Sequence, residues 1–232
     1  MNCPKCGSER CVKAGFNHGR QRYKCKDCVR QITQMEDKNA AHRAMALYLY
    51  IVGLSMNAIA RMIGVAPSSV LYWIRNFALR VYEKPTPQGA VVIELDERWH
   101  FLGSKKTKIW VWKAYCRTTG QLVDWECGDR SSKSLGKMLD RLTRLSVRIF
   151  FADRWQAYAE LISPELLIQT KAETHGIERN NFRRRHWCGR FRRKTCMVSR
   201  SLLMIDLSVF LFARFHVNGA REEIWNFVHN PY

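Results

Sequence analysis

The stretch Arg148-Ile149-Phe150-Phe151-Ala152-Asp153 decides how the C-terminal part of this 232-residue chain can fold. Its four apolar residues between two charges predict a short buried strand that ends at Asp153. A second apolar run, Val91-Val92-Ile93-Glu94-Leu95, leads to Asp96 in the same way. A charged group that follows a buried strand is costly without a partner, so both aspartates are predicted to lie at one functional point.

A third acid completes the pattern. Glu178 follows Asp153 after twenty-four intervening residues and stands at the head of a predicted basic helix. Glu173 competes for this place, but Glu178 has Asn181 and Arg185 on the same helix face. Hard cations such as Mg²⁺, or Mn²⁺ in its place, prefer carboxylate oxygens together with substrate phosphates. The trio therefore predicts a metal-dependent site for phosphoryl transfer.

Strand alternation separates the other acids near the first aspartate. Glu94 lies two residues before Asp96 and is predicted to border the site, whereas Glu97 is predicted to point the opposite way and not to bind metal.

The periodicity of the chain after residue 90 changes repeatedly between strand and helix. The first predicted strand, over 91–95, is followed by the aromatic stretch 99–101. Two more predicted strands, over 109–115 and 122–127, follow after short turns, and together they predict an antiparallel meander. An amphipathic helix over 131–145 follows. The remaining predicted elements are a strand over 148–152, a helix over 155–162, a brief apolar piece at 166–168 and helical sequence over 176–215. This order is that of a ribonuclease-H-like α/β domain, a mixed sheet with flanking helices. With the two smaller modules that precede it, the chain is predicted to be an α+β multidomain protein.

The charge predicts a polyanionic partner. The chain has 39 Lys and Arg against 20 Asp and Glu, a net charge of +19. Basic residues exceed acidic ones by 14 to 5 before residue 91 and by 25 to 15 after it. Because each neutralised phosphate releases counterions, both halves are predicted to contact DNA.

The N-terminus carries two cysteine knuckles. Cys3 and Cys6 form one pair, and Cys25 and Cys28 form the second after eighteen intervening residues. Two C-x2-C pairs offer four thiolates to a tetrahedral Zn²⁺, so residues 1–34 predict a zinc ribbon. Cys11 fits neither knuckle and is interpreted as a spectator. The ribbon either contacts DNA, which we favour, or only caps the next domain.

Residues 40–82 predict a helix-turn-helix domain. Ser55 caps one helix, Gly64 ends it, and Pro67 begins the next. An ordinary helical hairpin is the alternative, and the neighbouring zinc ribbon and the charge favour DNA recognition. The second helix would present to the major groove Ser68, Ser69, Tyr72 and Arg75. A linker with two prolines and a glycine, residues 83–89, leads to the predicted catalytic domain, residues 90–232.

Residues 179–194 hold eight Lys or Arg and no acid. A solvated charged face is the alternative, but the run follows Glu178 directly, so contact with DNA phosphates is favoured. The lead candidates are Arg179, Arg183, Arg184 and Arg190.

Two features indicate a cytoplasmic protein without a membrane partner. The N-terminus has no apolar core of a signal peptide, and the most apolar segment, Leu202 to Phe215, is interrupted by charge and too short to span a bilayer.

These motifs resemble the insertion-sequence-one family of bacterial transposases over nearly the whole chain. The resemblance rests on the knuckles, the helix-turn-helix, and three segments: Glu94-Leu-Asp96-Glu97, Phe151-Ala-Asp153-Arg-Trp-Gln-Ala-Tyr158 and Gly176-Ile-Glu178-Arg-Asn-Asn181.

The resemblance implies a catalytic triad of Asp96, Asp153 and Glu178 that holds two Mg²⁺ ions roughly 3.5–4 Å apart. It also implies cleavage and strand transfer on double-stranded DNA, with recognition of terminal inverted repeats by the N-terminal modules. Acting on two transposon ends and a target implies at least a homodimer on DNA. In such a bacterial or archaeal cell the protein would associate with the nucleoid.

Two other functions stay open from the residues. One is a non-catalytic zinc-ribbon and helix-turn-helix transcription regulator, and the other is a structure-selective nuclease without strand transfer. The presence of all three carboxylates favours the transposase.

Overall fold

The computed structural model describes residues 2–33, 39–170, 172–192, 195–220 and 223. The chain divides into two compact units, Met1–Ala40 and Ala41–Tyr232. The predicted zinc ribbon ends at Gln34 and the predicted catalytic domain at Tyr232, and both of these ends lie outside the described residues.

The first unit contains one small antiparallel sheet, of order β1-β2-β3. Its strands are β1 (Cys11–Asn17), β2 (Arg20–Cys25) and β3 (Gln31–Thr33). The β1–β2 turn places His18 at φ 46° and Gly19 at φ 76°, the positive values that a tight two-residue hairpin requires. The hairpin brings Cys25 opposite Cys11, near the start of the chain.

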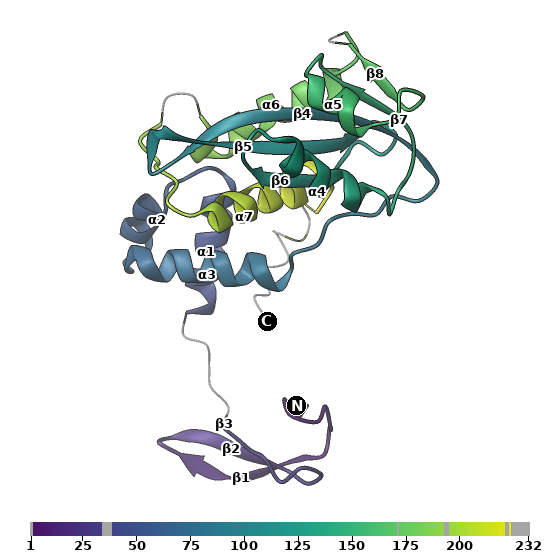
Figure 1. Ribbon diagram of the computed structural model, residues 1–232. Helices are drawn as coiled ribbons and strands as arrows, with labels where there is room; N and C mark the ends of the chain where they lie inside the picture. The colour runs from purple at the N-terminus through teal and green to yellow at the C-terminus, as the bar shows by residue number, and fades with distance from the viewer. Residues whose placement is uncertain (1, 34–38, 171, 193–194, 221–222, 224–232) are drawn as a thin grey trace. The chain divides into compact units, whose positions relative to one another are not determined.

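The second unit is built on a mixed five-stranded sheet of order β6-β5-β4-β7-β8 (Figure 1). The predicted meander forms its first three strands: β4 (Ala90–Leu102), β5 (Ser104–Cys116) and β6 (Gln121–Gly128) pair antiparallel. The strands β7 (Ser146–Ala152) and β8 (Leu167–Gln169) add in parallel on the other side of β4. This arrangement of strands resembles the ribonuclease-H-like fold.

The first strand is longer than the sequence predicts. β4 continues through Asp96 to Leu102, so Asp96 lies inside the strand and not at its end. The strand continues because its whole second half, from Asp96 to Phe101, pairs with β5. The parallel pairing with β7 stops at Glu94, two residues before Asp96.

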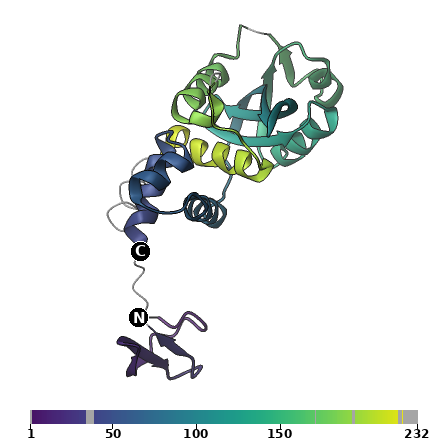
Figure 2. The ribbon, with the colours of Figure 1, turned by 90° about the vertical axis from the view of Figure 1, so that its left-hand side faces the viewer.

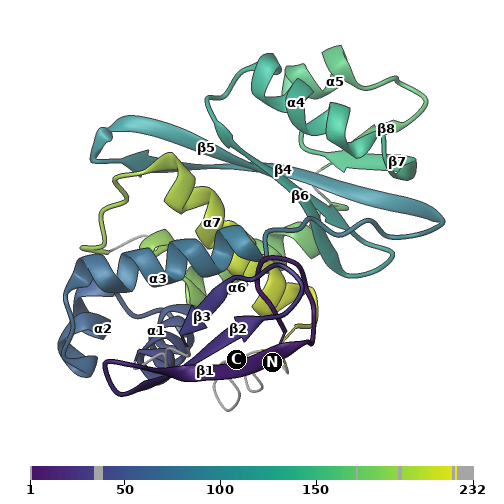
Figure 3. The ribbon, with the colours of Figure 1, turned by 90° about the horizontal axis from the view of Figure 1, so that it is seen from below.

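Helices cover both faces of the sheet. The helices α4 (Ser132–Leu142) and α5 (Gln156–Leu161) lie on one face, over a core that includes Ile93, Leu95 and Met138 (Figure 3). Ser131 caps α4 through the backbone N–H of Ser134. The helices α6 (His175–Trp187) and α7 (Leu202–Phe212) lie on the opposite face.

The prediction of continuous helix over 176–215 is wrong. A 3₁₀ turn, η1 (Gly189–Phe191), follows α6, and residues 195–201 are not helical. A Cβ on Gly189 would lie 2.5 Å from the backbone oxygen of Gly53, so only glycine allows the chain to pack this closely after α6. After α7 the chain forms a π-helical turn, η2 (Ala213–Val217). No helix among the described residues is both long enough and apolar enough to cross a lipid bilayer.

Three helices precede the sheet: α1 (Ala40–Ile51), α2 (Met56–Ile63) and α3 (Pro67–Arg80). As predicted, the Ser55 side chain accepts from Ala58 N at 3.1 Å, Gly64 ends α2 at φ 72°, and Pro67 begins α3.

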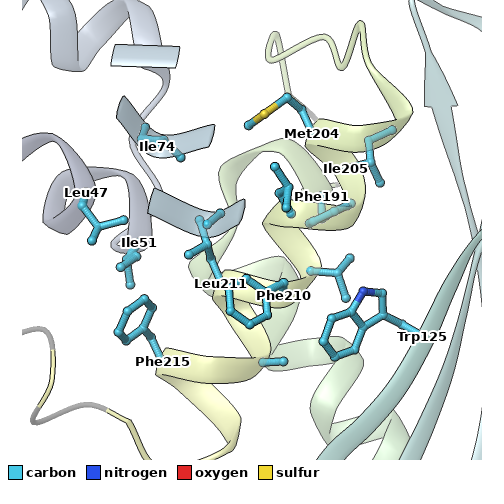
Figure 4. Packing of buried hydrophobic residues seen from close by; sticks show 14 of the residues in the cluster. Leu47, Ile51, Ile74, Trp125, Phe191, Met204, Ile205, Phe210, Leu211 and Phe215 are labelled. Carbon is cyan, nitrogen blue, oxygen red and sulfur yellow. The ribbon is translucent and has the colours of Figure 1, made fainter. Parts of the chain in front are cut away.

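The helices α1 and α3 share a hydrophobic core with α7, which lies between them and the sheet (Figure 2). Ile51 and Ile74 meet Leu211 and Phe215 in this core (Figure 4). The residues predicted as a helix-turn-helix domain (40–82), linker (83–89) and catalytic domain (90–232) thus fall in one compact unit, because apolar side chains of α1–α3 are buried against α7.

A buried carboxylate ties the predicted linker to the sheet. Asp124 of β6 is fully buried and forms ion pairs with Lys84 at 2.8 Å, Arg141 at 2.8 Å and Arg144 at 2.9 Å. Burial raises the pKa of Asp124, but the hydrogen bonds from Arg141 and the charge of Lys84 outweigh it and lower the pKa below its ordinary value.

We expect Asp124→Asn to lower the free energy of unfolding by about 3 kcal/mol at neutral pH, because three cations lose their buried partner. A lowered folded-state pKa stabilises the fold above the unfolded-state pKa of about 3.9, and that stability is lost as pH falls through the folded-state value. The difference between variant and parent should therefore shrink in acid. Urea unfolding across pH measures it, with Asp140→Asn, an exposed acid on α4, as control. A difference that stays constant down to low pH would contradict this.

Candidate active site and metal cluster

Asp96 lies in β4, and Asp153 directly follows the neighbouring strand β7. The parallel register of β4 and β7 pairs Glu94 with Phe151, and Asp96 and Asp153 each come two residues after this pair. Because side chains alternate along a strand, Asp96 shares the sheet face of Glu94. The Asp96 side chain is 17% exposed, and Asp153 is half-buried directly after β7 ends. Both aspartates therefore come just after the point where the parallel pairing of β4 and β7 stops.

Helix α6 covers this point through Asn181. The Asn181 Nδ2 donates to Asp96 Oδ2 at 2.6 Å, and Arg98 Nε donates to the same oxygen at 3.2 Å. Asn181 is buried, and its Oδ1 has no hydrogen-bond partner among the described residues. An unpaired buried oxygen therefore remains beside the Asp96 carboxylate.

A second carboxylate fixes the start of α6. Glu94 is buried, and its Oε2 accepts from the backbone N–H of Ile177 at 2.7 Å. Its Oε1 accepts from Arg117 Nε at 2.9 Å. A Cβ on Gly176 would lie 2.9 Å from Glu94 Oε1 and 2.5 Å from Tyr115 Cε1, so only glycine allows this approach. A negative group at a helix N-terminus is also favoured by the helix dipole.

Glu178 lies in the first turn of α6, exposed, one turn before Asn181. Its rival Glu173 lies before the helix, 52% exposed, and pairs with Arg117 at 3.0 Å. Among the described residues, the carboxylates of Asp96, Asp153 and Glu178 do not form a group whose oxygens all lie within 4.8 Å of one another. The structure thus places Asp96 and Asp153 on or directly after adjacent strands, and Glu178 in the first turn of α6, the helix that Asn181 links to Asp96.

A buried lysine adjoins the acids and was not singled out from the sequence. Lys113 of β5 lies directly opposite Asp96 and is fully buried. Its Nζ donates to Asn180 Oδ1 at 2.8 Å, and burial lowers the pKa of Lys113 well below its ordinary value. The available signal was a single lysine inside the apolar strand 109–115. Lys113 helps to hold α6 on the sheet.

Glu97 points to the other face of the sheet, toward α5. It is buried, its Oε1 accepts from Arg130 Nη2 at 2.6 Å, and its Oε2 accepts from the Tyr158 hydroxyl at 2.8 Å. Burial raises the pKa of Glu97. These partners give Glu97 a structural place between β4 and α5.

The four knuckle cysteines form one cluster in the first unit. The Sγ atoms of Cys3 and Cys28 are 3.4 Å apart, and those of Cys6 and Cys25 are 3.6 Å apart. All four cysteines are free thiols. A tetrahedron of thiolates at the 2.3 Å zinc–sulfur distance has edges of roughly 3.8 Å, so the geometry is consistent with a structural zinc ion. Backbone N–H groups of Cys28 and Asp27 lower the pKa of Cys25 to about 6, which favours the thiolate. Cys11 is outside the cluster.

The predicted DNA-binding residues differ in exposure. On α3, Ser68, Tyr72 and Arg75 are exposed and Ser69 is half-buried. On and after α6, Arg179 is exposed, and Arg183 and Arg190 are half-buried and donate to the backbone oxygens of His216 and Met204.

Arg184 lies in the interior instead. It is 5% exposed and its guanidinium packs over the Phe191 ring at 4.6 Å, because the face of α6 that carries Ile177 and Asn180 also carries Arg184. It is therefore not on the surface where a phosphate would bind.

Comparisons of the sequence with a family model and with known proteins point to the same family. The family model described as IS1 transposase matches residues 90–217. The insertion element iso-IS1n protein InsB of Shigella dysenteriae is 32% identical over 128 residues, which are 55% of this chain and 98% of that protein. The insertion element IS1 2 protein InsB of Escherichia coli K12 is 30% identical over 123 residues, 53% of this chain and 74% of that protein.

Among solved structures, a chain of the simian T-cell lymphotropic virus intasome in complex with the PP2A regulatory subunit B56 gamma is similar, at 15% identity and a TM-score of 0.38. The similarity covers 80% of this chain and 74% of that one. The family model spans the whole sheet and α4 to α7, the region that holds the acids described above. The chain belongs to the IS1 transposase family and is a DDE transposase that acts in DNA transposition.

Proposed function

We propose that this transposase binds the terminal inverted repeats of its insertion sequence and catalyses Mg²⁺-dependent DNA cleavage and strand transfer at Asp96, Asp153 and Glu178. The observation that supports it best is the β4–β7 register, which pairs Glu94 with Phe151, the residues that precede Asp96 and Asp153 by two positions. Helix α6, held on the same strand by Asn181, carries the third carboxylate.

The donor set fits Mg²⁺. Carboxylate oxygens are the ligands that this cation prefers, and the unpaired Asn181 Oδ1 adds a further oxygen beside Asp96. When bound, Mg²⁺ or Mn²⁺ supplies activation of an attacking water or 3′-hydroxyl and stabilisation of the leaving oxygen.

The surrounding side chains keep the acids in place. Asn181 holds one oxygen of Asp96 by its amide N–H, so the carboxylate has one preferred orientation. Glu94 fixes the first turn of α6, and with it the position from which Glu178 projects. Arg98, ion-paired with Asp96, places a positive charge where a DNA phosphate would approach.

Two further modules supply DNA affinity in this proposal. The α2–α3 pair acts as a helix-turn-helix whose second helix enters the major groove with Ser68, Ser69, Tyr72 and Arg75. The zinc-binding first unit contacts DNA through its basic hairpin. Since two transposon ends and a target must be joined, the active form is at least a dimer on DNA.

The direct test incubates the purified protein with labelled transposon-end duplex and Mg²⁺. We expect nicks at the 3′ ends and joined products, which depend on the metal. Binding without nicks or joined products would favour a DNA-binding regulator.

Base recognition is tested on α3. Tyr72→Ala and Arg75→Ala should each reduce the preference for end DNA over random DNA by about 1–3 kcal/mol, the amount that one good base contact supplies. Competition binding at constant salt measures this preference. Unchanged preference in both variants would remove α3 from the recognition surface.

Phosphate contact is tested on α6 with the exposed residue Arg179. Arg179→Ala should weaken binding to end and random DNA alike and reduce the salt slope by about one unit, since one phosphate contact is lost. Affinities across a salt series measure the slope. A loss confined to end DNA would make Arg179 a base contact instead.

A further inference from the structure

Trp99 is a large exposed indole close to the acids. It lies on β4 three residues after Asp96, about 10 Å along the strand, and is 52% exposed. By strand alternation it shares the face of Glu97, the face that α4 and α5 cover. The β4–β5 hairpin extends past these two helices at its closed end (Figure 3). The exposure of Trp99, near that end, agrees with this arrangement.

Aromatic and cationic groups continue from Trp99 toward the second aspartate. Trp99 pairs across the strands with Trp110, on the same face. The guanidinium of Arg130 lies between the rings of Trp110, at 4.6 Å, and Trp155, at 5.1 Å. The backbone N–H of Trp155 in turn donates to Asp153 Oδ1 at 3.0 Å. These aromatic and cationic side chains therefore form a row from Trp99 on the hairpin to Asp153.

From Arg98 onward, the charged residues of the β4–β5 hairpin are all basic. Residues 98–123 contain no Asp or Glu. The start of β5, directly after the turn, carries Lys105, Lys106 and Lys108, all exposed. A basic surface with interleaved aromatic rings is the pattern that binds single-stranded nucleic acid, because rings stack on bases and cations follow the backbone.

The edge of β4 connects the two faces. In the described part of the chain, the pairing of β4 with β7 ends at Glu94, so from Asp96 onward this edge of β4 has no paired strand. A DNA strand whose phosphate lies at Asp96 on one face can therefore pass this edge and turn a base toward Trp99 on the other. A base can reach the indole in this way only if it is not paired.

We propose that Trp99 stacks an unpaired base of the DNA strand next to the cleaved phosphate, while Lys105, Lys106 and Lys108 hold the backbone of that strand. The proposal rests on the function proposed above and names the form of the substrate: DNA opened at the reacting position. Extruding a base costs a few kcal/mol, which stacking on an aromatic ring offsets.

The test uses the full chain and two fluorescent probes, a single-stranded oligo(dT) and a random-sequence duplex of equal length. Trp99→Ala should weaken oligo(dT) binding five- to hundredfold, the range expected for loss of one stacked base, and leave duplex binding unchanged. Trp99→Phe, which keeps an aromatic ring, should retain most of the affinity. Tyr48→Ala removes an exposed aromatic of α1 and should change neither probe.

A 2-aminopurine base placed next to the cleavage position of end DNA reports stacking directly. Its fluorescence should be quenched by the parent protein and by Trp99→Phe, but not by Trp99→Ala.

Unchanged oligo(dT) affinity in Trp99→Ala would overturn the proposal, and so would equal losses for both probes. A change of Trp99→Ala from dimer to monomer in sedimentation would also overturn it and assign the indole to contact between copies. These binding measurements need no catalysis, so a failure of the catalytic assignment is seen separately, as cleavage that survives in Asp96→Ala.

Discussion

Asp96→Ala and Asp153→Ala are each expected to abolish cleavage and strand transfer, by roughly a thousandfold or more, while end-DNA binding stays nearly intact. Removing a metal ligand at an in-line displacement costs several kcal/mol of transition-state stabilisation, and each 1.36 kcal/mol is about tenfold in rate. Affinity comes from the basic surfaces elsewhere and should not change. Labelled-end cleavage with Mg²⁺ and binding by gel shift measure the two quantities.

The control for these variants must be an exposed acid. Glu97 is unsuitable, although the sequence suggested it, because its carboxylate is buried between Arg130 and Tyr158 and its loss would damage the packing of α5. Asp140→Ala, on the exposed side of α4, should retain full activity. If both aspartate variants cleaved DNA at the parental rate, the assignment of Asp96 and Asp153 as catalytic residues would be wrong.

Cys25→Ser is expected to abolish zinc binding and unfold the first unit. Within the described part of that unit, its sheet has little core of its own, and the buried apolar residues there before the helices are Cys3 and Cys25. Metal binding must therefore supply most of the folding free energy, for which about 10–16 kcal/mol is typical of small structural zinc sites. Elemental analysis should find about one zinc per parent chain and almost none in the variant, together with rapid proteolysis before residue 40.

Cys11→Ser is the matched control for zinc. Cys11 lies near the cluster, with its Sγ 3.8 Å from the backbone oxygen of Ser8, but it is not one of the four clustered thiols. This variant should keep its zinc and its resistance to protease. Full zinc content in Cys25→Ser, or loss of zinc in Cys11→Ser, would show that the ligand set is different.

Local patterns predicted the secondary structure well where a single element carries its own signal. Ser131 and Ser55 begin α4 and α2, and the three strands of the meander follow alternation and short turns. The extent of β4 did not follow from its own residues, because strand continuation past Asp96 depends on pairing with β5. The break after α6 likewise depends on close packing of Gly189 against Gly53.

The candidate site was predictable in residue type but not in its supports. Asp96 and Asp153 each follow an apolar run, so their place near one sheet edge could be read from the sequence. The roles of Glu94 and Lys113 depend on α6 docking over the sheet, which no local pattern specifies. The burial of Arg184, in contrast, could have been predicted from the sequence. Arg184 comes seven residues after Ile177, so both lie on the buried face of α6, but its place in a run of arginines suggested an exposed residue instead.

Glu178, on α6, is proposed as the third carboxylate of the site, and a paired comparison of two variants decides whether it is. Glu178→Gln and Glu173→Gln are compared in the same assay of labelled transposon ends with Mg²⁺. Because Glu178 projects from the helix that Asn181 holds on Asp96, its variant should lose both cleavage and joining. Glu173 is 52% exposed and paired with Arg117, so its variant should stay close to the parent. Activity in Glu178→Gln together with loss in Glu173→Gln would contradict the account and place the third ligand before the helix.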